Sequence, residues 1–169
     1  AAEGVTVLNQ TPSAFKQLME ADKVASRLSA LRFVIFGGEA LSLQDLRPWF
    51  EWYQNDGPSL VNMYGITETT VHVTYKLIRR QDLQTPAASL IGEPIPDLQL
   101  FLLDEQMNLV PPGVVGQMYV GGAGLAEGYL HRESLTKERF LPSPFTKNAR
   151  LYKTGDLAKR RFDGELEYI

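Results

Sequence analysis

Residues 31–65 of this chain read LRFVIFGGEALSLQDLRPWFEWYQNDGPSLVNMYG, and this stretch decides the fold. Residues 31–36 form an almost wholly apolar run that a pair of glycines ends, and residues 59–64 form a second run that ends at Gly65. Both runs have the length and composition of buried strands. A helical pattern lies between them, so the order strand, helix, strand predicts a right-handed crossover and a mainly parallel sheet.

The helix between the two strands is predicted to begin at Ser42, because Asp45 three residues later completes the pattern of a capping box. Its large apolar residues recur at helical spacing and so share one face. They are Leu43, Leu46, Trp49, Phe50 and Tyr53.

A strand and a helix also precede this stretch. Residues 5–8 form a short apolar strand, and Thr11 with Pro12 then gives an N-cap followed by proline at the first helical position. Apolar residues follow at helical spacing, namely Phe15, Leu18 and Met19. The first half of the chain therefore alternates between strand and helix.

The pattern changes near residue 71. Residues 71–78 suggest one more strand, and from Ser89 onward the runs are short, strand-like and separated by turn-forming residues. Asp163-Gly164 between two apolar runs is a strong hairpin signal. In this part only residues 134–139 have a helical pattern.

We therefore expect an α/β fold in two parts. Residues 1–88 would form the parallel-sheet βαβ half, and residues 89–169 an antiparallel β-barrel-like subdomain. The chain opens almost directly on a strand and stops inside another, whereas native domains more often begin and end in exposed polar segments. We expect both ends to be cuts within a longer protein.

Composition excludes several classes of function. The 169 residues carry a formal charge of -3, and their charges are interspersed, which gives no basic stripe for nucleic acid and no patch for anionic lipid. No apolar run approaches the roughly 20 residues of a membrane span. The chain has no cysteine, which excludes disulfides and thiol catalysis and fits a reducing compartment. We expect a cytoplasmic protein.

The first of three glycine-bearing segments is residues 62–69, NMYGITET, at the carboxyl end of a predicted parallel strand. Open α/β sheets place their ligands at this edge. Gly65 permits a sharp turn, after which Thr67 offers a hydroxyl to a phosphate oxygen and Glu68 a carboxylate to Mg²⁺. The alternative for Glu68 is a solvated side chain in a plain turn.

The other two segments are residues 116–130, GQMYVGGAGLAEGYL, and residues 151–157, LYKTGDL. The first fits neither the Walker nor the dinucleotide-binding pattern, so we interpret it as a tight turn where backbones approach closely. In the second, Asp156 is placed either to accept from sugar hydroxyls or simply to complete a turn.

Together, in this order and spacing, the three segments resemble the adenylate-forming enzyme superfamily. Its pattern is Asn-x-Tyr-Gly-x-Thr-Glu, then a glycine-rich segment ending in Gly-Tyr-Leu, then Tyr-Arg/Lys-Thr-Gly-Asp-Leu. The chain departs from it only in the glycine-rich segment, at Gln117, Met118 and Glu127. Residues 8–13 and 36–41 look specifically like the adenylation domains of non-ribosomal peptide synthetases. The βαβ half would then be the end of a flavodoxin-like subdomain.

This resemblance implies an ATP site built from the same segments. Gly38, Glu39 and Asn62 would border the adenine, and Tyr64 would stack on the ring. Asp156 would bind the ribose hydroxyls.

The resemblance assigns catalytic roles to two further residues. Thr67 would contact phosphate, and Glu68 would hold Mg²⁺ as the one metal ligand from the chain. The resemblance implies that the parent domain activates an amino acid with ATP to an aminoacyl-adenylate, and that the aminoacyl group is then loaded onto the phosphopantetheine thiol of a carrier protein.

In this family a few cavity-lining positions select the amino acid, and here they resemble those of threonine-activating domains. The positions present are Asn9, Ile35, Gly37, Met63, Val71 and His72. Asn9 and His72 can hydrogen-bond a hydroxyl, while Met63 and Val71 accommodate a methyl group. From the residues alone, ordinary core packing is the favoured explanation for the apolar members, and a satisfied strand histidine is the favoured one for His72.

The resemblance further implies that the phosphate loop and the aspartate for the substrate amine precede this chain, and that the lobe with the catalytic lysine follows it. We expect the chain alone to be inactive, and peptidyl carrier and condensation domains to be its partners. Two alternatives stay open: another adenylate-forming ligase, for a different amino acid or an acyl substrate, and a non-catalytic split-domain fragment.

Overall fold

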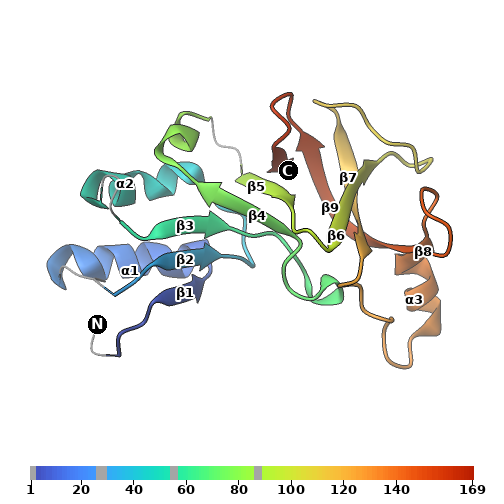
Figure 1. The fold of residues 1–169 in the computed structure, drawn as a ribbon, viewed down its shortest axis with the longest axis horizontal. Helices are drawn as coiled ribbons and strands as arrows, with labels where there is room; N and C mark the ends of the chain where they lie inside the picture. Colours follow the sequence, from blue (N-terminus) through green and yellow to red (C-terminus); the bar gives the residue numbers. More distant parts are fainter. Residues whose placement is uncertain (1–2, 26–29, 54–56, 86–88) are drawn as a thin grey trace.

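The computed structural model describes residues 3–25, 30–53, 57–85 and 89–169. Within these ranges the strands form one ten-stranded sheet in the order β1-β2-β3-β4-β5-β10-β9-β7-β6, with β8 paired to β9. Figure 1 shows this sheet running the length of the molecule, with helices α1 and α2 at one end and α3 at the other. No helix of the described ranges is long and apolar enough to cross a membrane.

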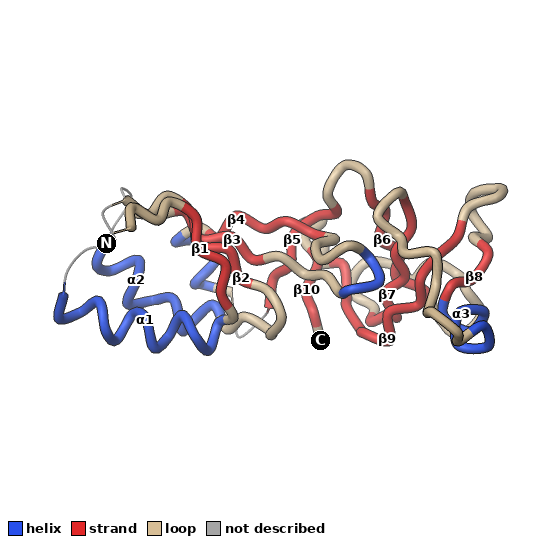
Figure 2. The backbone as a smooth tube through the Cα atoms, turned by 90° about the horizontal axis from the view of Figure 1, so that it is seen from below, coloured by secondary structure: helices blue, strands red, loops and turns tan. Residues whose placement is uncertain are grey.

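The first three strands are parallel, as the sequence predicts. They are β1 (Val7–Gln10), β2 (Phe33–Phe36) and β3 (Ser59–Asn62). The crossovers contain α1 (Pro12–Ala25), the 3₁₀ turn η1 (Leu43–Leu46) and α2 (Arg47–Tyr53). Figure 2 shows these helices on one face of the parallel strands.

The core of this half is aromatic. The ring of Phe15 on α1 lies 5.0 Å from that of Phe36 on β2 and 5.0 Å from that of Trp49 on α2. All three side chains are buried. The predicted N-cap is confirmed, because the Thr11 carbonyl accepts from the N–H of Phe15 at 3.0 Å and its hydroxyl from Ala14 at 3.4 Å.

The predicted capping box at Ser42 is wrong. Ser42 does stand at the N-cap, but its side chain makes no capping hydrogen bond. The element that follows is a 3₁₀ turn, in which the N–H of Asp45 donates to the Ser42 carbonyl at 3.2 Å. The Asp45 carboxylate instead forms an ion pair with Lys16 of α1, at 2.7 Å. The ion pair between α1 and η1 is therefore formed in place of the predicted capping hydrogen bonds.

Several strand boundaries differ from the expected ones: β2 begins at Phe33 rather than at residue 31, and β3 ends at Asn62 rather than at residue 64. β1 occupies residues 7–10 rather than 5–8, and β4 (Thr74–Ile78) begins three residues later than expected. The delay has a backbone cause, since Thr70 and Val71 have φ of 57° and 71°. A left-handed conformation cannot continue an extended strand, so β4 begins only after this bend.

The second half is antiparallel, as expected. Its strands are β4, β5 (Ser89–Pro94), β6 (Leu98–Leu103), β7 (Val115–Gly122), β8 (Phe140–Pro142), β9 (Arg150–Arg160) and β10 (Leu166–Tyr168). The predicted helix is α3 (Glu133–Arg139). The predicted hairpin at Asp163-Gly164 joins β9 to β10, with Gly164 at a φ of 91°.

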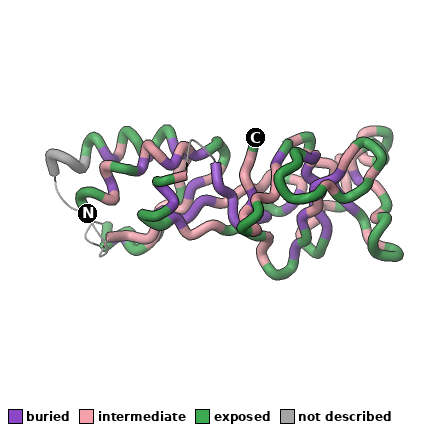
Figure 3. The backbone as a smooth tube through the Cα atoms, turned by 90° about the horizontal axis from the view of Figure 1, so that it is seen from above, coloured by how far each residue is buried: buried purple, intermediate pink, exposed green. Residues whose placement is uncertain are grey.

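The parallel and antiparallel parts share one sheet. β4 pairs antiparallel with both β3 and β5, and η3 (Arg80–Gln84) lies between β4 and β5 in the chain. Gly92 is essential here, because a Cβ on it would lie 2.1 Å from the Tyr75 carbonyl oxygen. Figure 3 shows the buried backbone following the sheet, with exposed segments in the loops around it.

Candidate active site

The loop between β3 and β4 forms the centre of the candidate site. An ideal Cβ on Gly65 would lie 2.0 Å from the Val71 carbonyl oxygen, so only glycine lets the loop close on itself. The 3₁₀ turn η2 (Thr67–Thr69) spans the loop, and the N–H of Val71 donates to the Ile66 carbonyl at 3.2 Å. The close approach fixes the positions of Thr67 and Glu68.

The first cavity beside this loop, the Tyr64 cavity, encloses about 320 Å³. All five residues expected to surround a nucleoside line it: Gly38, Glu39, Asn62, Tyr64 and Asp156. Other lining residues are Ala40, Met63, Gly65, Ile66, Ser89, Ile91 and Tyr168. The structure therefore brings together residues that the sequence separates by more than a hundred positions.

The Asp156 carboxylate is held by two tyrosines. The Tyr64 hydroxyl donates to Oδ2 at 2.6 Å, and the Tyr168 hydroxyl donates to Oδ1 at 3.2 Å. The N–H of Asp156 donates to the Thr154 hydroxyl at 3.0 Å. Burial, and then the hydrogen bond to Asp156, raise the pKa of Tyr64, so the phenol remains a donor.

Two of the expected adenine neighbours already have partners within the protein. The Asn62 side-chain amide donates to the Leu90 carbonyl at 2.8 Å and is buried. The Glu39 carboxylate accepts from the Ser13 hydroxyl at 2.8 Å and from the Ser13 N–H at 3.1 Å, at the start of α1. These hydrogen bonds from Ser13 lower the pKa of Glu39. Both residues thus tie elements together as well as lining the cavity.

The second cavity, the His72 cavity, encloses about 640 Å³. All six positions expected to select the substrate line it: Asn9, Ile35, Gly37, Met63, Val71 and His72. Gln10, Thr11, Gly38, Gly65, Ile66 and Thr67 complete the lining. An ideal Cβ on Gly37 would lie 3.6 Å from Cε1 of His72, so a side chain at residue 37 would occupy the space next to the imidazole.

His72 is neutral in this setting, because burial lowers the pKa of its imidazole. A neutral imidazole offers one donor and one acceptor nitrogen. Asn9 on β1, 63 residues before His72 in the sequence, contributes a side-chain amide to the same cavity. The His72 cavity therefore combines two hydrogen-bonding side chains with the apolar surfaces of Ile35 and Met63.

The two cavities share part of their walls, at Gly38, Met63, Gly65 and Ile66. Ligands in the two cavities would therefore lie next to one another across the loop of residues 62–72. Thr67 lines the His72 cavity and is exposed, which leaves its hydroxyl open to a ligand at this border.

Glu68 lies next to Thr67 and accepts hydrogen bonds from two tyrosines at the same carboxylate oxygen. The hydroxyls of Tyr129 and Tyr152 both donate to Oε1, the latter at 3.0 Å. Burial alone would raise the pKa of Glu68, but the hydrogen bonds, that from Tyr129 foremost, bring it below its usual value. The carboxylate is therefore ionised at neutral pH.

The donor set around Glu68 fits Mg²⁺ in one specific way. Among the described residues, no three His, Cys, Asp or Glu side chains gather into a metal cage. Mg²⁺ commonly takes one or two carboxylates and completes its shell with water and substrate phosphates. An ionised carboxylate with one oxygen engaged by tyrosines and Oε2 outside that pair suits this arrangement.

The family model described as AMP-binding enzyme matches residues 1–130. The chain belongs to the AMP-binding enzyme family. The expected resemblance is therefore confirmed at the level of the family.

Relatives of this AMP-binding enzyme segment include a dimodular nonribosomal peptide synthase of Bacillus subtilis (strain 168), 54% identical over 171 residues. That match covers 99% of the chain and 7% of the relative. Syringomycin synthase SyrB1 of Pseudomonas syringae pv. syringae is 48% identical over 168 residues, which cover 99% of the chain and 27% of that protein.

Among solved structures, PA1221, an NRPS protein containing adenylation and PCP domains, matches with a TM-score of 0.89 at 30% identity. The match covers 100% of the chain and 34% of PA1221. The chain therefore spans about a third or less of the length of each of these three proteins. In sequence the chain is similar to part of each of the two synthases, and in fold it is similar to part of PA1221.

The glycine-rich segment of this family member is a close backbone contact, as the sequence predicts. A Cβ on Gly122 would lie 2.4 Å from the Asp97 carbonyl oxygen. Beyond it, the Gly124 carbonyl accepts from the Thr70 hydroxyl at 2.7 Å, and the N–H of Ala126 donates to the Glu68 carbonyl at 2.9 Å. The glycine-rich segment therefore holds the loop of residues 62–72 in place through two hydrogen bonds.

Three tyrosines at the site were not among the residues expected from the sequence. Tyr168 lines the Tyr64 cavity, and Tyr129 and Tyr152 contact Glu68. Tyr129 and Tyr152 do belong to the glycine-rich segment and the Lys-Thr-Gly-Asp segment, so the motifs contained them. Their pairing with Glu68 depends on contacts 61 and 84 residues apart, which spacing does not indicate.

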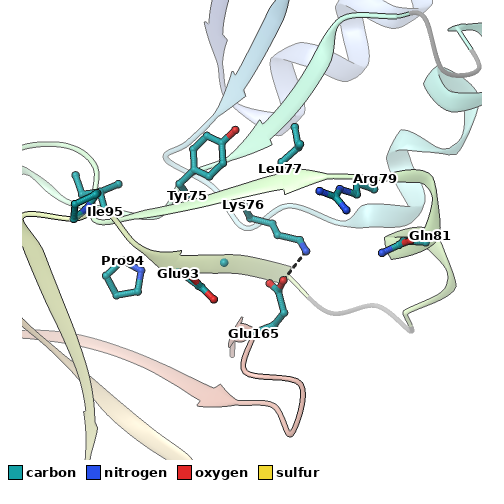
Figure 4. Close-up of a pocket in the computed structure, with 11 residues that line it drawn as sticks. Tyr75, Lys76, Leu77, Arg79, Gln81, Glu93, Pro94, Ile95 and Glu165 are labelled. Carbon is teal, nitrogen blue, oxygen red and sulfur yellow. Dashed lines mark hydrogen bonds and ion pairs between the residues drawn. The ribbon is translucent and has the colours of Figure 1, made fainter.

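A third cavity, of about 570 Å³, lies where β4 and β5 meet the β9–β10 hairpin, and none of the expected site residues lines it. Figure 4 shows Lys76 of β4 pointing toward Glu165 of the hairpin, an ion pair at 2.8 Å. Lys76 also lies 3.5 Å from Asp82, and its side chain is 12% exposed. This cavity marks the junction of the two parts of the sheet.

Proposed function

We propose that this chain is part of a domain that activates an amino acid with ATP, forming an aminoacyl-adenylate. The observation that carries the proposal is the shared wall between the Tyr64 cavity and the His72 cavity. The reaction joins an amino-acid carboxylate to the α-phosphate of ATP, so the two substrates must lie side by side. Holding two reactants in contact supplies a large share of such a rate enhancement.

The nucleoside of ATP would occupy the Tyr64 cavity. An ionised carboxylate has about four lone-pair sites, and the two tyrosine hydroxyls take two of those on Asp156. The remaining sites can accept from the two ribose hydroxyls. Tyr64 offers an aromatic face to the base, next to Gly38, whose missing side chain leaves space.

In the reaction, a carboxylate oxygen of the amino acid attacks the α-phosphorus, and the bond from that phosphorus to the bridging oxygen of pyrophosphate breaks. The Thr67 hydroxyl would donate to a phosphate oxygen and orient it. Glu68 would hold Mg²⁺, which when bound offsets the negative charge of the phosphates. The adenylate then loses AMP when the phosphopantetheine thiol of a carrier domain attacks its acyl carbon.

We further propose L-threonine as the amino acid. Asn9 and the neutral His72 would hydrogen-bond its hydroxyl, and Met63, Val71 and Ile35 would contact its methyl group. Gly37 leaves the space beside His72 that this side chain needs. Fidelity at the hydroxyl is expected to be high, because a substrate without the hydroxyl would leave Asn9 and His72 without hydrogen-bond partners.

Carrier and condensation domains of the same synthetase are the proposed partners, and the cytoplasm the proposed location. The carrier is supported by PA1221, which contains adenylation and PCP domains. We also keep the division into residues 1–88 and 89–169 as a proposal. Its support is the purely antiparallel pairing from β5 onward, although β4 within residues 1–88 is antiparallel as well. Apolar contacts cross the division, since Leu90 packs in the same core as Phe15 and Trp49.

Amino-acid-dependent ATP–pyrophosphate exchange by the complete domain tests the proposal. Threonine should support exchange more strongly than the other amino acids. Exchange with a different amino acid or an acyl substrate would retain the ligase and remove threonine. A domain that binds neither ATP nor a non-hydrolysable adenylate analogue would instead be a non-catalytic one.

A further inference from the structure

Three segments of the chain converge on the Glu68 carboxylate. Glu68 lies in η2, Tyr129 lies in the glycine-rich segment beyond the end of β7, and Tyr152 lies in β9. Both hydroxyls donate to Oε1 of Glu68, and the two hydroxyl oxygens are 2.9 Å apart. Oε1 and the two phenol oxygens therefore form a closed triangle, in which both phenol protons are directed at Oε1.

The two phenol rings are fixed by packing. Phe140 lies between them, with ring centroids 5.8 Å from Tyr129 and 4.8 Å from Tyr152. Tyr152 is 3% exposed, in a strand paired on both sides. The N–H of Tyr129 donates to the Thr136 hydroxyl of α3 at 2.9 Å. Gly128 permits this approach, since a Cβ there would lie 2.5 Å from Thr136.

The backbone of Glu68 is fixed independently of its side chain. Its carbonyl accepts from the N–H of Ala126, and the hydroxyl of Thr70, two residues later, donates to the Gly124 carbonyl at 2.7 Å. With the backbone held in this way, the tyrosines are not needed to place the loop. Their hydroxyls instead restrict the rotation of the Glu68 carboxylate.

The arrangement has a chemical consequence. The two donors on Oε1 restrict the rotation of the carboxylate and leave Oε2 outside the triangle, while the N–H of Glu68 also donates to the carboxylate. A phenol keeps its proton at neutral pH, since its ordinary pKa is about 10. The phenols therefore donate to the carboxylate and do not compete with it for a cation.

From this geometry we propose that Tyr129 and Tyr152 are positioning residues, which orient the Glu68 carboxylate so that Oε2 is free to bind a divalent cation carried by ATP. The inference rests on the proposed metal role of Glu68 and deepens it. Partners of this kind, which orient a metal ligand through hydrogen bonds, typically contribute about 10–100-fold to metal affinity or activity.

The test is equilibrium binding, measured without turnover. In the complete adenylation domain, isothermal titration calorimetry would measure binding of an α,β-methylene ATP analogue over a series of Mg²⁺ concentrations. Tyr129→Phe and Tyr152→Phe should each raise the Mg²⁺ concentration for half-maximal enhancement by about tenfold, and the double variant by up to about 100-fold. Binding of the amino acid should stay unchanged.

Tyr119→Phe is the matched control. Tyr119 is also a buried tyrosine of this sheet, 3% exposed, but its hydroxyl donates to Gln117 at 3.2 Å, away from Glu68. This variant should keep the wild-type Mg²⁺ dependence. A merely structural role of Tyr129 or Tyr152 would lower the unfolding temperature and leave the Mg²⁺ dependence unchanged, which would overturn the proposal.

Glu68→Gln distinguishes the proposed metal role of Glu68 from the proposed positioning role of the two tyrosines. If Glu68→Gln shifts the Mg²⁺ dependence and the two Tyr→Phe variants do not, the positioning role is refuted and the metal role stands. If Glu68→Gln leaves the dependence at its wild-type value, the metal role in the proposed function fails and the positioning role fails with it. Shifts in all three variants support both.

Discussion

At Gly65 the chain leaves β3 and turns back so closely that an ideal Cβ would lie 2.0 Å from the Val71 carbonyl oxygen and 2.7 Å from Cα of His72. The same turn places Thr70 and Val71 in the left-handed region. Such a conformation is costly for a β-branched residue and persists only where the surrounding structure imposes it. One residue without a side chain thus determines where the cavity-lining Val71 and His72 lie.

Gly65→Ala tests this dependence. The new methyl group would clash with backbone, which is less able to move than a side chain, so the free energy of unfolding should fall by about 1–3 kcal/mol or more. Binding of both ATP and the amino acid should weaken, because the loop borders both cavities. Denaturant unfolding of the complete domain measures the first effect and calorimetry the second.

Gly37→Ala serves as the control for Gly65→Ala. Its Cβ would lie at an ordinary contact distance, 3.6 Å, from His72 and from the Met63 carbonyl oxygen. The stability of the domain should therefore change little, although the His72 cavity becomes smaller. Equal destabilisation by both substitutions would contradict the importance of the Gly65 contact.

His72 allows a test of substrate selection at the level of single residues. Valine has nearly the shape of threonine without its hydroxyl, and it would leave Asn9 and His72 unpaired, so discrimination can reach about 10⁴. Serine lacks only a methyl group, which is worth about 10–200-fold. His72→Leu should lower the preference for threonine over valine more than the preference for threonine over serine. The measurement is the rate of ATP–pyrophosphate exchange with each of the three amino acids. A wild-type domain that prefers valine to serine would rule out a hydroxyl-selecting cavity.

At the scale of elements, the junction between β4 and the β9–β10 hairpin contains an ion pair that water reaches poorly. Lys76 contacts Glu165 at 2.8 Å and Asp82 at 3.5 Å, and the side chains of Lys76 and Asp82 are 12% and 10% exposed. Asp82 also accepts from the N–H of Arg79 at 2.7 Å at the start of η3. One lysine therefore connects β4, η3 and the hairpin that leads to Tyr168, and Figure 4 shows its ion pair with Glu165 of the hairpin.

Lys76→Met should destabilise the complete domain markedly. Removing one partner of a buried ion pair leaves the other charges without compensation and typically costs about 3–5 kcal/mol. Denaturant unfolding would measure the loss. Lys16→Met is the control, because Lys16 pairs with Asp45 on an exposed surface, where its side chain is 53% exposed. Similar stabilities of the two variants would show that the junction does not depend on this pair.

At the scale of the whole molecule, the chain contains the two cavities but spans about a third of the length of PA1221. Charge neutralisation along the triphosphate is a large component of catalysis in reactions of this kind. The family resemblance implies that two other parts of the domain supply most of this charge neutralisation. They are a phosphate loop and a mobile lysine, and neither is among the residues of this chain.

The chain alone is therefore expected to show no threonine-dependent ATP–pyrophosphate exchange, whereas the complete domain should exchange readily. Both would be assayed at equal concentration with the same substrates. Circular dichroism of the chain would establish that it is folded under the assay conditions. Robust exchange by the folded chain would show that the catalytic groups are assigned to the wrong parts of the domain.

Local sequence determined the features that depend on near neighbours. Thr11 and Pro12 begin α1 by themselves, and Asp163-Gly164 forms its hairpin, because caps and tight turns need only a few adjacent residues. The strand pattern also indicated parallel pairing of the strands up to β3 and antiparallel pairing from Ser89 onward. Motif resemblance identified the residues that gather at the two cavities.

Tertiary structure alone decided which of these residues meet and what they contact. The Asp45 carboxylate pairs with Lys16 rather than capping its own helix, and the Asn62 amide is used to hold the Leu90 carbonyl. The pairing of Glu68 with two distant tyrosines has no sequence signal, since it arises from contacts 61 and 84 residues apart. A periodic pattern indicates which face of an element is buried. Only the packed sheet determines which polar groups from distant parts of the chain come close enough to form hydrogen bonds with one another.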